Sequence, residues 1–210
     1  MPCFKGPNKR SLWQRTQDMA VRMGLMEDSD RVADVPLSSE TEAALLAAND
    51  QSNYGKSIQE ILSRRQEIED DLLVGHLCGL LMEKESASGM DGLSDPERVF
   101  YLVGDMMRQL DSGGFNTYFY NTGHLAHMLL PALEQIQSVE AKAIATAAMA
   151  KYGKVPSANH DEMLAELSDL TQEFENNPWE TEDDQYFELE EHLAALLMDY
   201  AGKHTGDFAL

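Results

Sequence analysis

Apolar side chains recur along this chain at the spacing of an α-helix, and no segment alternates over the length of a β-strand. The clearest helix begins where Ser94 and Glu97 form a capping-box pattern, with Pro96 in the first turn. Its inner face is marked by apolar residues three or four positions apart, namely Val99, Leu102, Val103, Met106, Met107 and Leu110. Gly113 and Gly114 are predicted to end this helix, because glycine tolerates the left-handed backbone of a C-terminal cap.

An aromatic segment from Phe115 to Tyr120 follows the two glycines, and its large apolar surface must be buried. Asn121 or Thr122 is the predicted cap of the next helix, whose apolar face reaches Ile136. The stretch 93–136 is therefore predicted to be a helical hairpin pinned by aromatic side chains.

The same spacing predicts further helices on both sides of this hairpin. Ser57 and Glu60 begin a long helix that reaches Leu81, in which Gly75 and Gly79 predict close packing or a break. Before it, helices are predicted from Ser11 to Met26 and from Ser39 through Ala48. After the hairpin, the predicted helices are an Ala-rich one capped by Ser138 and stopped at Gly153, one opened by Asn159 and Glu162, and a final one from about Asp183 to Ala201.

The predicted fold class is all-α: a single multi-helix globular domain with an N-terminal helical extension. The segment from Ser86 to Gly92 is the predicted joint between the two parts. It divides the chain into an extension, residues 1–92, and a core, residues 93–210.

The composition suits a protein of the reducing cytoplasm. Of the 210 residues, 43% are hydrophobic, which is enough for a core, and the two cysteines are too few for a disulfide framework. No leader pattern and no run of about 18 apolar residues occurs, so we expect a cytoplasmic protein without a membrane contact.

Charge is the strongest functional signal in the sequence. The net charge is −21, which disfavours direct contact with nucleic acid because phosphates demand Lys and Arg. Between Val155 and Gly202 there are fourteen carboxylates and no Lys or Arg. On the helix opened by Asn159, carboxylates form one stripe beside the apolar face, and the final helix repeats this arrangement.

Two hypotheses explain these carboxylates. One is a solvated face that keeps an acidic protein soluble. The other is a surface that binds a basic partner, for which the candidate residues are Asp161, Glu162, Glu166, Asp169, Glu173, Glu175, Glu180, Glu182, Asp183, Asp184, Glu188 and Glu191.

Other chemistry is weakly indicated. His124 and His127 lie three apart, but no Cys and no Glu-x-x-His pair supports them, so neither a metal site nor any cofactor is predicted. No catalytic or nucleotide-binding motif occurs, so an enzyme is not predicted. Tyr118, Tyr120, Asn121 and His124 form a candidate pocket; the alternative is that buried tyrosines simply need hydrogen-bond partners and that Asn121 caps a helix.

The run Asp111 to Asn121, DSGGFNTYFYN, resembles the Gly-Gly-Phe, aromatic and Asn signature of a bacterial domain of unknown function. That domain includes the DMP (DNA-mimic protein) group. The resemblance covers roughly residues 93–208, including Asp183 to Phe187 and Leu196 to Tyr200. The family usually has Asn and Gln where this chain has Ser112 and Thr117.

The resemblance implies an all-helical fold and, for at least one relative, an acidic dimer that occupies a DNA-binding protein's site. Together with the charge, it predicts a DNA-mimic-like protein that binds a basic DNA-binding protein such as a transcription regulator. Alternatives are an inhibitor of a basic nuclease-type toxin, or a small-molecule-binding protein or enzyme using the 118–124 region. A homodimer is predicted from the resemblance and from apolar residues of the extension that exceed one small core: Leu12, Trp13, Ile58 and Ile61.

Overall fold

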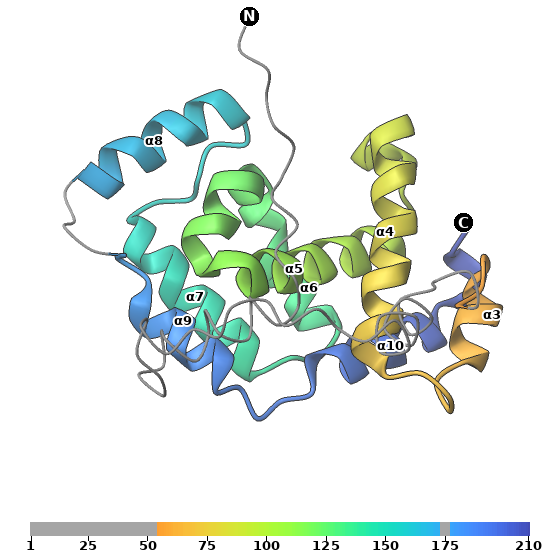
Figure 1. Cartoon of the computed structure of the whole chain (residues 1–210). Coiled ribbons are helices and arrows are strands. Elements are labelled where there is room, and N and C mark those ends of the chain that lie inside the picture. The colour runs from red at the N-terminus through yellow and green to blue at the C-terminus, as the bar shows by residue number, and fades with distance from the viewer. Residues whose placement is uncertain (1–53, 173–176) are drawn as a thin grey trace, which may run out of the picture. The chain divides into compact units, whose positions relative to one another are not determined.

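Helix α5 (Asp95–Thr122) runs through the middle of the part of the chain that the computed structural model describes, residues 54–172 and 177–210 (Figure 1). Every regular element within those residues is a helix, which confirms the all-α prediction. Within the same residues, no helix is both long and apolar enough to cross a membrane. Expectations for residues 1–53 and 173–176 lie outside the described part.

Seven other α-helices in the described residues pack on α5 or on one another. α4 (Asp70–Ser88), α6 (Ala126–Gln135), α8 (His160–Gln172), α9 (Glu180–Phe187) and α10 (Leu193–Lys203) all contact α5. α3 (Ile58–Ser63) packs on α4 and α10, and α7 (Glu140–Tyr152) packs on α6 and α9. In Figure 1, α3, α4 and α10 lie to one side of α5, and α7, α8 and α9 lie to the other.

The start of α5 confirms the predicted capping box. Ser94 Oγ accepts a hydrogen bond from the Glu97 backbone N–H at 3.3 Å, and Glu97 Oε2 accepts one from the Ser94 backbone N–H at 2.8 Å. The helix leaves its regular path at the two glycines, where Gly114 has φ 71°. A second helical stretch begins at Phe115, so the first stretch ends at the two glycines as predicted, and a kink joins the two stretches within α5.

The predicted caps at Asn121 and Thr122 are wrong, because both residues still belong to α5. Asn121 Nδ2 donates to Gln109 Oε1 at 2.8 Å, and Thr122 Oγ1 donates to the Tyr118 carbonyl at 3.2 Å. α6 instead follows a short 3₁₀ helix, η4 (Gly123–Leu125), and has no side-chain cap.

The single long helix predicted from Ser57 is two helices, α3 and α4. The capping box at Ser57 and Glu60 is confirmed, but the chain turns after Arg64, and this turn lets Ile61 and Leu73 enter one core. The break or close packing predicted at Gly75 and Gly79 is wrong, because α4 is continuous there and an added Cβ would meet nothing within 4 Å.

The predicted final helix is also two helices, α9 and α10, because Glu191 lies in the connection and binds the start of α7. Its carboxylate accepts hydrogen bonds from Ser138 Oγ at 2.5 Å and from the backbone N–H groups of Val139 at 3.0 Å and Ala141 at 3.3 Å. The prediction that Ser138 caps α7 is therefore wrong. Glu191 caps this helix, and Ser138 donates a hydrogen bond to Glu191. The stop at Gly153 is confirmed by its left-handed backbone, φ 82°.

α3 and α4, which the sequence places in the N-terminal extension, share one hydrophobic core with α5 and α10. Ile58 and Ile61 are buried in that core, so they do not supply the excess apolar surface expected of them. Leu12 and Trp13 lie outside the described residues. The homodimer remains a prediction that rests on the family resemblance.

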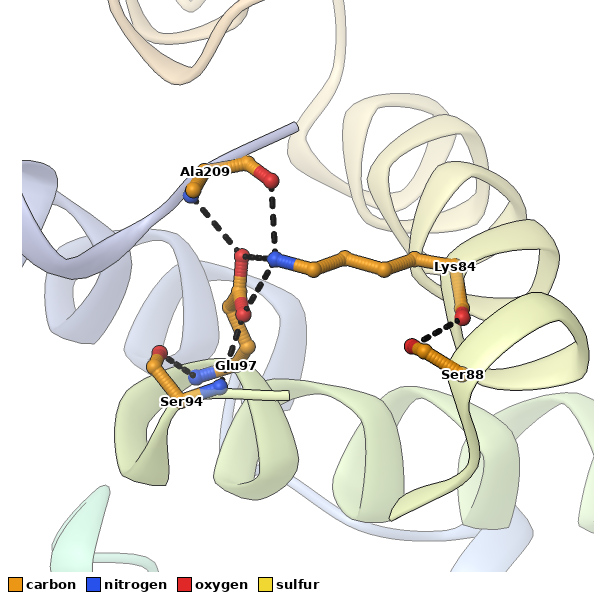
Figure 2. A network of polar contacts seen from close by, with 5 residues as sticks. All are labelled: Lys84, Ser88, Ser94, Glu97 and Ala209. Atoms are coloured by element: carbon orange, nitrogen blue, oxygen red, sulfur yellow. Dashed lines mark hydrogen bonds and ion pairs between the residues drawn. The ribbon is translucent and has the colours of Figure 1, made fainter. Parts of the chain in front are cut away.

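Glu97 is completely buried and holds three segments together (Figure 2). Lys84 Nζ of α4 donates to its two carboxylate oxygens at 2.7 and 2.8 Å, and the Ala209 backbone N–H donates to Oε1 at 2.9 Å. Lys84 also donates to the Ala209 carbonyl at 2.8 Å. Burial alone would raise the pKa of Glu97, but the hydrogen bonds from Lys84, Ser94 and Ala209 outweigh it and lower that pKa.

Candidate partner-binding surface

α8 exposes three carboxylates because its apolar residues face the rest of the fold. Asn159 Oδ1 accepts a hydrogen bond from the Glu162 backbone N–H at 3.1 Å, which confirms the predicted start of this helix. Met163 and Leu167 are buried, and Met163 packs against Gly123 of η4. The exposed face carries Asp161, Glu162 and Asp169. Among these, only Glu162 has a hydrogen bond within the described residues, accepted from Ser157 Oγ at 2.9 Å.

α9 exposes a second set of carboxylates, anchored by the residue that precedes it. Trp179 is completely buried, its Nε1 donates to the Ala148 carbonyl at 3.0 Å, and its ring centroid lies 4.8 Å from that of Phe119. With Trp179 fixed, Glu180 and Asp184 of α9 are exposed, and so is Glu188, the residue directly after the helix. Residues four positions apart rise by about 6 Å along a helix axis.

Glu166, predicted as a partner-binding residue, is occupied by contacts within the fold. It is ion-paired with Lys154 at 2.8 Å, and it accepts hydrogen bonds from the Ser157 backbone N–H at 3.1 Å and from the Tyr152 hydroxyl at 3.3 Å. The hydrogen bond from Lys154 is the largest cause of the lowered pKa of Glu166. This carboxylate holds α8 to the end of α7.

Glu182 is also used internally. Its side chain is only 6% exposed and pairs with Lys151 of α7 at 2.6 Å, while Lys151 also donates to the Pro178 carbonyl at 3.0 Å. The pair joins α9 to α7.

Asp183 binds the chain where α5 kinks. Its two oxygens accept hydrogen bonds from the Phe115 backbone N–H and from Asn177 Nδ2, both at 2.7 Å. A Cβ on Gly114 would clash with this carboxylate, so the close approach requires glycine. Burial raises the pKa of Asp183, and the two hydrogen bonds offset part of that rise.

The twelve predicted partner-binding residues therefore fall into three groups. Four are committed to contacts inside the fold, namely Glu166, Glu182, Asp183 and Glu191. Glu173 and Glu175 lie outside the described residues. The remaining six are exposed, and we call them the acidic surface: Asp161, Glu162, Asp169, Glu180, Asp184 and Glu188.

The sequence did not reveal that two lysines, Lys151 and Lys154, pair with two of the predicted partner-binding carboxylates. Lys151 and Lys154 lie directly before the interval without Lys or Arg, and each neutralises one carboxylate inside it. Their partners are 31 and 12 positions downstream, so no helical spacing connects them. The six carboxylates of the acidic surface have no ion pair among the described residues.

The residues of the candidate pocket do not converge on one space. Tyr118 is buried against Phe115 and Phe119, whereas the neighbouring Tyr120 is 59% exposed. Asn121 is exposed and bonded to Gln109, and His124 faces His160. Asn121 also does not cap a helix, because it lies inside α5.

A cleft of about 770 Å³ opens elsewhere, between the start of α4, the middle of α5 and the connection from α9 to α10. Carboxylates are frequent along it: Glu67, Glu69, Asp70, Asp71, Asp111 and Glu191. Burial and the nearby charge of Asp71 raise the pKa of Asp111. Arg65 supplies a cation here and pairs with Asp70 and Asp199, both at 2.7 Å.

A protein-family model described as DMP19-like protein matches residues 91–204, which is more than half of the chain. The matched segment contains all of α5 to α9 and every residue of the acidic surface. No curated protein and no solved structure matches the sequence.

Proposed function

Because this chain belongs to the DMP19-like family, a DNA-mimic protein family, we propose that its acidic surface binds a basic DNA-binding protein in place of DNA. A transcription regulator is the class of partner that fits such a role. The protein then acts by occupying a site and not by catalysing a reaction.

The observation that carries this proposal is the uneven use of charge in the C-terminal part. Lys151 and Lys154 pair with Glu182 and Glu166, and within the described residues the six carboxylates of the acidic surface have no ion-pair partner. A merely solvated helix commonly pairs Glu with Lys four positions away, and neither helix does so. The carboxylates of the acidic surface can therefore bind Lys and Arg side chains of another protein.

The charges of the acidic surface are spaced more widely than those of duplex DNA. Glu180, Asp184 and Glu188 recur at rises of about 6 Å, whereas duplex DNA carries one charge per about 1.7 Å of axis. The acidic surface is thus a sparser charge array than DNA and engages fewer Lys and Arg residues of the partner.

The partner can be obtained by affinity capture from a cell lysate at low salt and elution with a salt gradient. Captured protein is then bound to a fluorescent DNA duplex, and displacement of the DNA by this protein is followed by anisotropy. We expect competitive displacement that weakens as salt rises, because exposed charges are screened within about 10 Å at 0.1 M salt.

The decisive variant neutralises only exposed carboxylates of α8: Asp161→Asn, Glu162→Gln and Asp169→Asn. A matched control makes the same change of charge on α4 and the turn after it, Asp71→Asn, Glu83→Gln and Asp91→Asn, all of which are exposed. We expect the α8 variant to displace DNA at least about tenfold less well than wild type, which corresponds to about 0.5 kcal/mol for each lost contact. The control should match wild type.

Equal displacement by the α8 variant, the control and wild type would show that these carboxylates are only solvated. Equal weakening of both variants would show a response to net charge without a defined surface. Glu166 is left intact in this design, because its loss would loosen α8 and confuse folding with binding.

A further inference from the structure

Two histidines from different elements meet at the start of α8. His124 belongs to η4 and His160 is the first residue of α8, and their Nδ1 atoms are 3.4 Å apart. The ring centroids are 5.1 Å apart and the ring planes are nearly perpendicular, at 82°. In the sequence, the neighbour of His124 at helical spacing is His127. In the structure, His127 Nδ1 lies 3.1 Å from the backbone carbonyl of His124.

The separation of the two nitrogens matches the bite of a tetrahedral metal ion. With a Zn–N bond of about 2.05 Å, nitrogens 3.4 Å apart subtend an angle of about 112° at the ion, close to the tetrahedral value. The same separation suits a hydrogen bond between the two rings, so the distance by itself leaves both arrangements open.

The surroundings favour a cation. Asp161 and Glu162 follow His160 in the first turn of α8, and their charges offset the positive end of the helix dipole. His160 is exposed, so water can complete the coordination.

We propose that His124 and His160 together bind a divalent transition metal of the zinc, nickel and copper class, through their Nδ1 atoms. Imidazole nitrogen is a preferred ligand of these ions. Within the described residues, no group of three or more His, Cys, Asp or Glu side chains is arranged to hold a metal, so the site has two protein ligands and water in the other positions. The bound ion joins η4 to the first turn of α8.

The test is a calorimetric titration of the full chain with Zn²⁺ at pH 7.5, in a Cys3→Ser background that removes a competing thiol. We expect one saturable site in wild type. His160→Gln should weaken it by at least about tenfold, because removing a ligand costs no less than removing a residue that only orients one. His127→Gln is the matched control and should bind Zn²⁺ as wild type does. Nitrogen NMR of the imidazoles should show Zn²⁺ shifting Nδ1 of His124 and His160.

Absence of saturable binding in wild type would overturn the proposal and leave a hydrogen-bonded pair. Unchanged affinity in His160→Gln, or an equal loss in His127→Gln, would equally overturn the assignment of these two ligands. His160 is exposed, so His160→Gln should stay folded even where His124→Gln does not, and circular dichroism of each variant verifies this.

Discussion

Lys84→Met removes the only side-chain cation that contacts Glu97 in the described residues and leaves a buried carboxylate unpaired (Figure 2). The Glu97 side chain is 0% exposed, so its charge has no access to water once Lys84 is gone. Breaking a buried ion pair from one side typically costs about 3–5 kcal/mol, because the remaining charge is uncompensated. We expect a loss of that size in the free energy of unfolding.

The opposite change, Glu97→Gln, should cost less, about 1–3 kcal/mol. Lys84 is 25% exposed, so its ammonium group can still reach solvent when the carboxylate is removed. The two variants should differ in stability because the Lys84 side chain is partly exposed and the Glu97 side chain is not. This difference is independent of how strongly the two charges attract each other.

Urea denaturation at 25 °C, followed by circular dichroism, measures these differences. Lys142→Met is the control, because its partner Glu134 is 72% exposed and such pairs contribute at most about 1 kcal/mol. A loss below about 1 kcal/mol in Lys84→Met, or a larger loss in Glu97→Gln than in Lys84→Met, would refute the argument.

The pH dependence gives a second check on the same pair. The pKa of Glu97 is lowered in the folded chain, so its contribution to stability is fully present above the ordinary glutamate pKa of 4.5 and is lost as pH falls through the folded pKa. The stability difference between wild type and Lys84→Met should therefore shrink in acid. A difference that stays constant from neutral pH down to the onset of acid unfolding would contradict this assignment.

Two further predictions concern carboxylates that bind helix starts. Gly114→Ala should lower the free energy of unfolding by about 2–4 kcal/mol, because it combines backbone strain with the clash against Asp183. Gly153→Ala should cost only about 1–2 kcal/mol, from strain alone. Equal losses in thermal or urea unfolding would show that the clash is relieved. Glu191→Ala should cost about 1–2 kcal/mol by uncapping α7, and Glu188→Ala should change the unfolding midpoint little; the reverse order would reject the capping role.

Local signals in the sequence were sufficient for the fold class and for several helix boundaries. Ser57 with Glu60 and Ser94 with Glu97 form their capping boxes because both partners are within one turn. Gly153 stops α7 through its own backbone. These features depend on residues that are neighbours along the chain, so a pattern of spacing detects them.

The errors arose where a distant residue decides the local structure. Helical periodicity continued across 188–192, but Glu191 is drawn to the start of α7 and interrupts the helix. The kink at Gly114 is stabilised by Asp183, which no spacing within α5 reveals. Tertiary contacts override propensity at such points.

The candidate surface was predicted only in part for the same reason. Periodicity places a carboxylate on a helix face, but it does not show whether a lysine from another helix covers it. Glu162 and Glu166 had the same standing in the sequence, but Glu166 is bound by Lys154, Tyr152 and the Ser157 backbone. The pairing of His124 with His160 required two elements to be brought together, whereas the sequence offered only His127 on the same stretch.

The carboxylate of Asp183 lies 68 positions from the backbone N–H of Phe115 that it binds, and this separation bears on the order in which the chain folds. Glu191 is about 50 positions from the α7 residues it caps, and Ala209 is 112 positions from Glu97. A chain growing from a ribosome therefore exposes the second half of α5 and the whole of α7 before their partners exist. Such long loops close late because the entropy of closure precedes the gain in contacts. The acidic segment from residue 177 onward therefore supplies these contacts only after α5 and α7 have been synthesised, and nascent chains that stop before residue 177 should stay open to proteases.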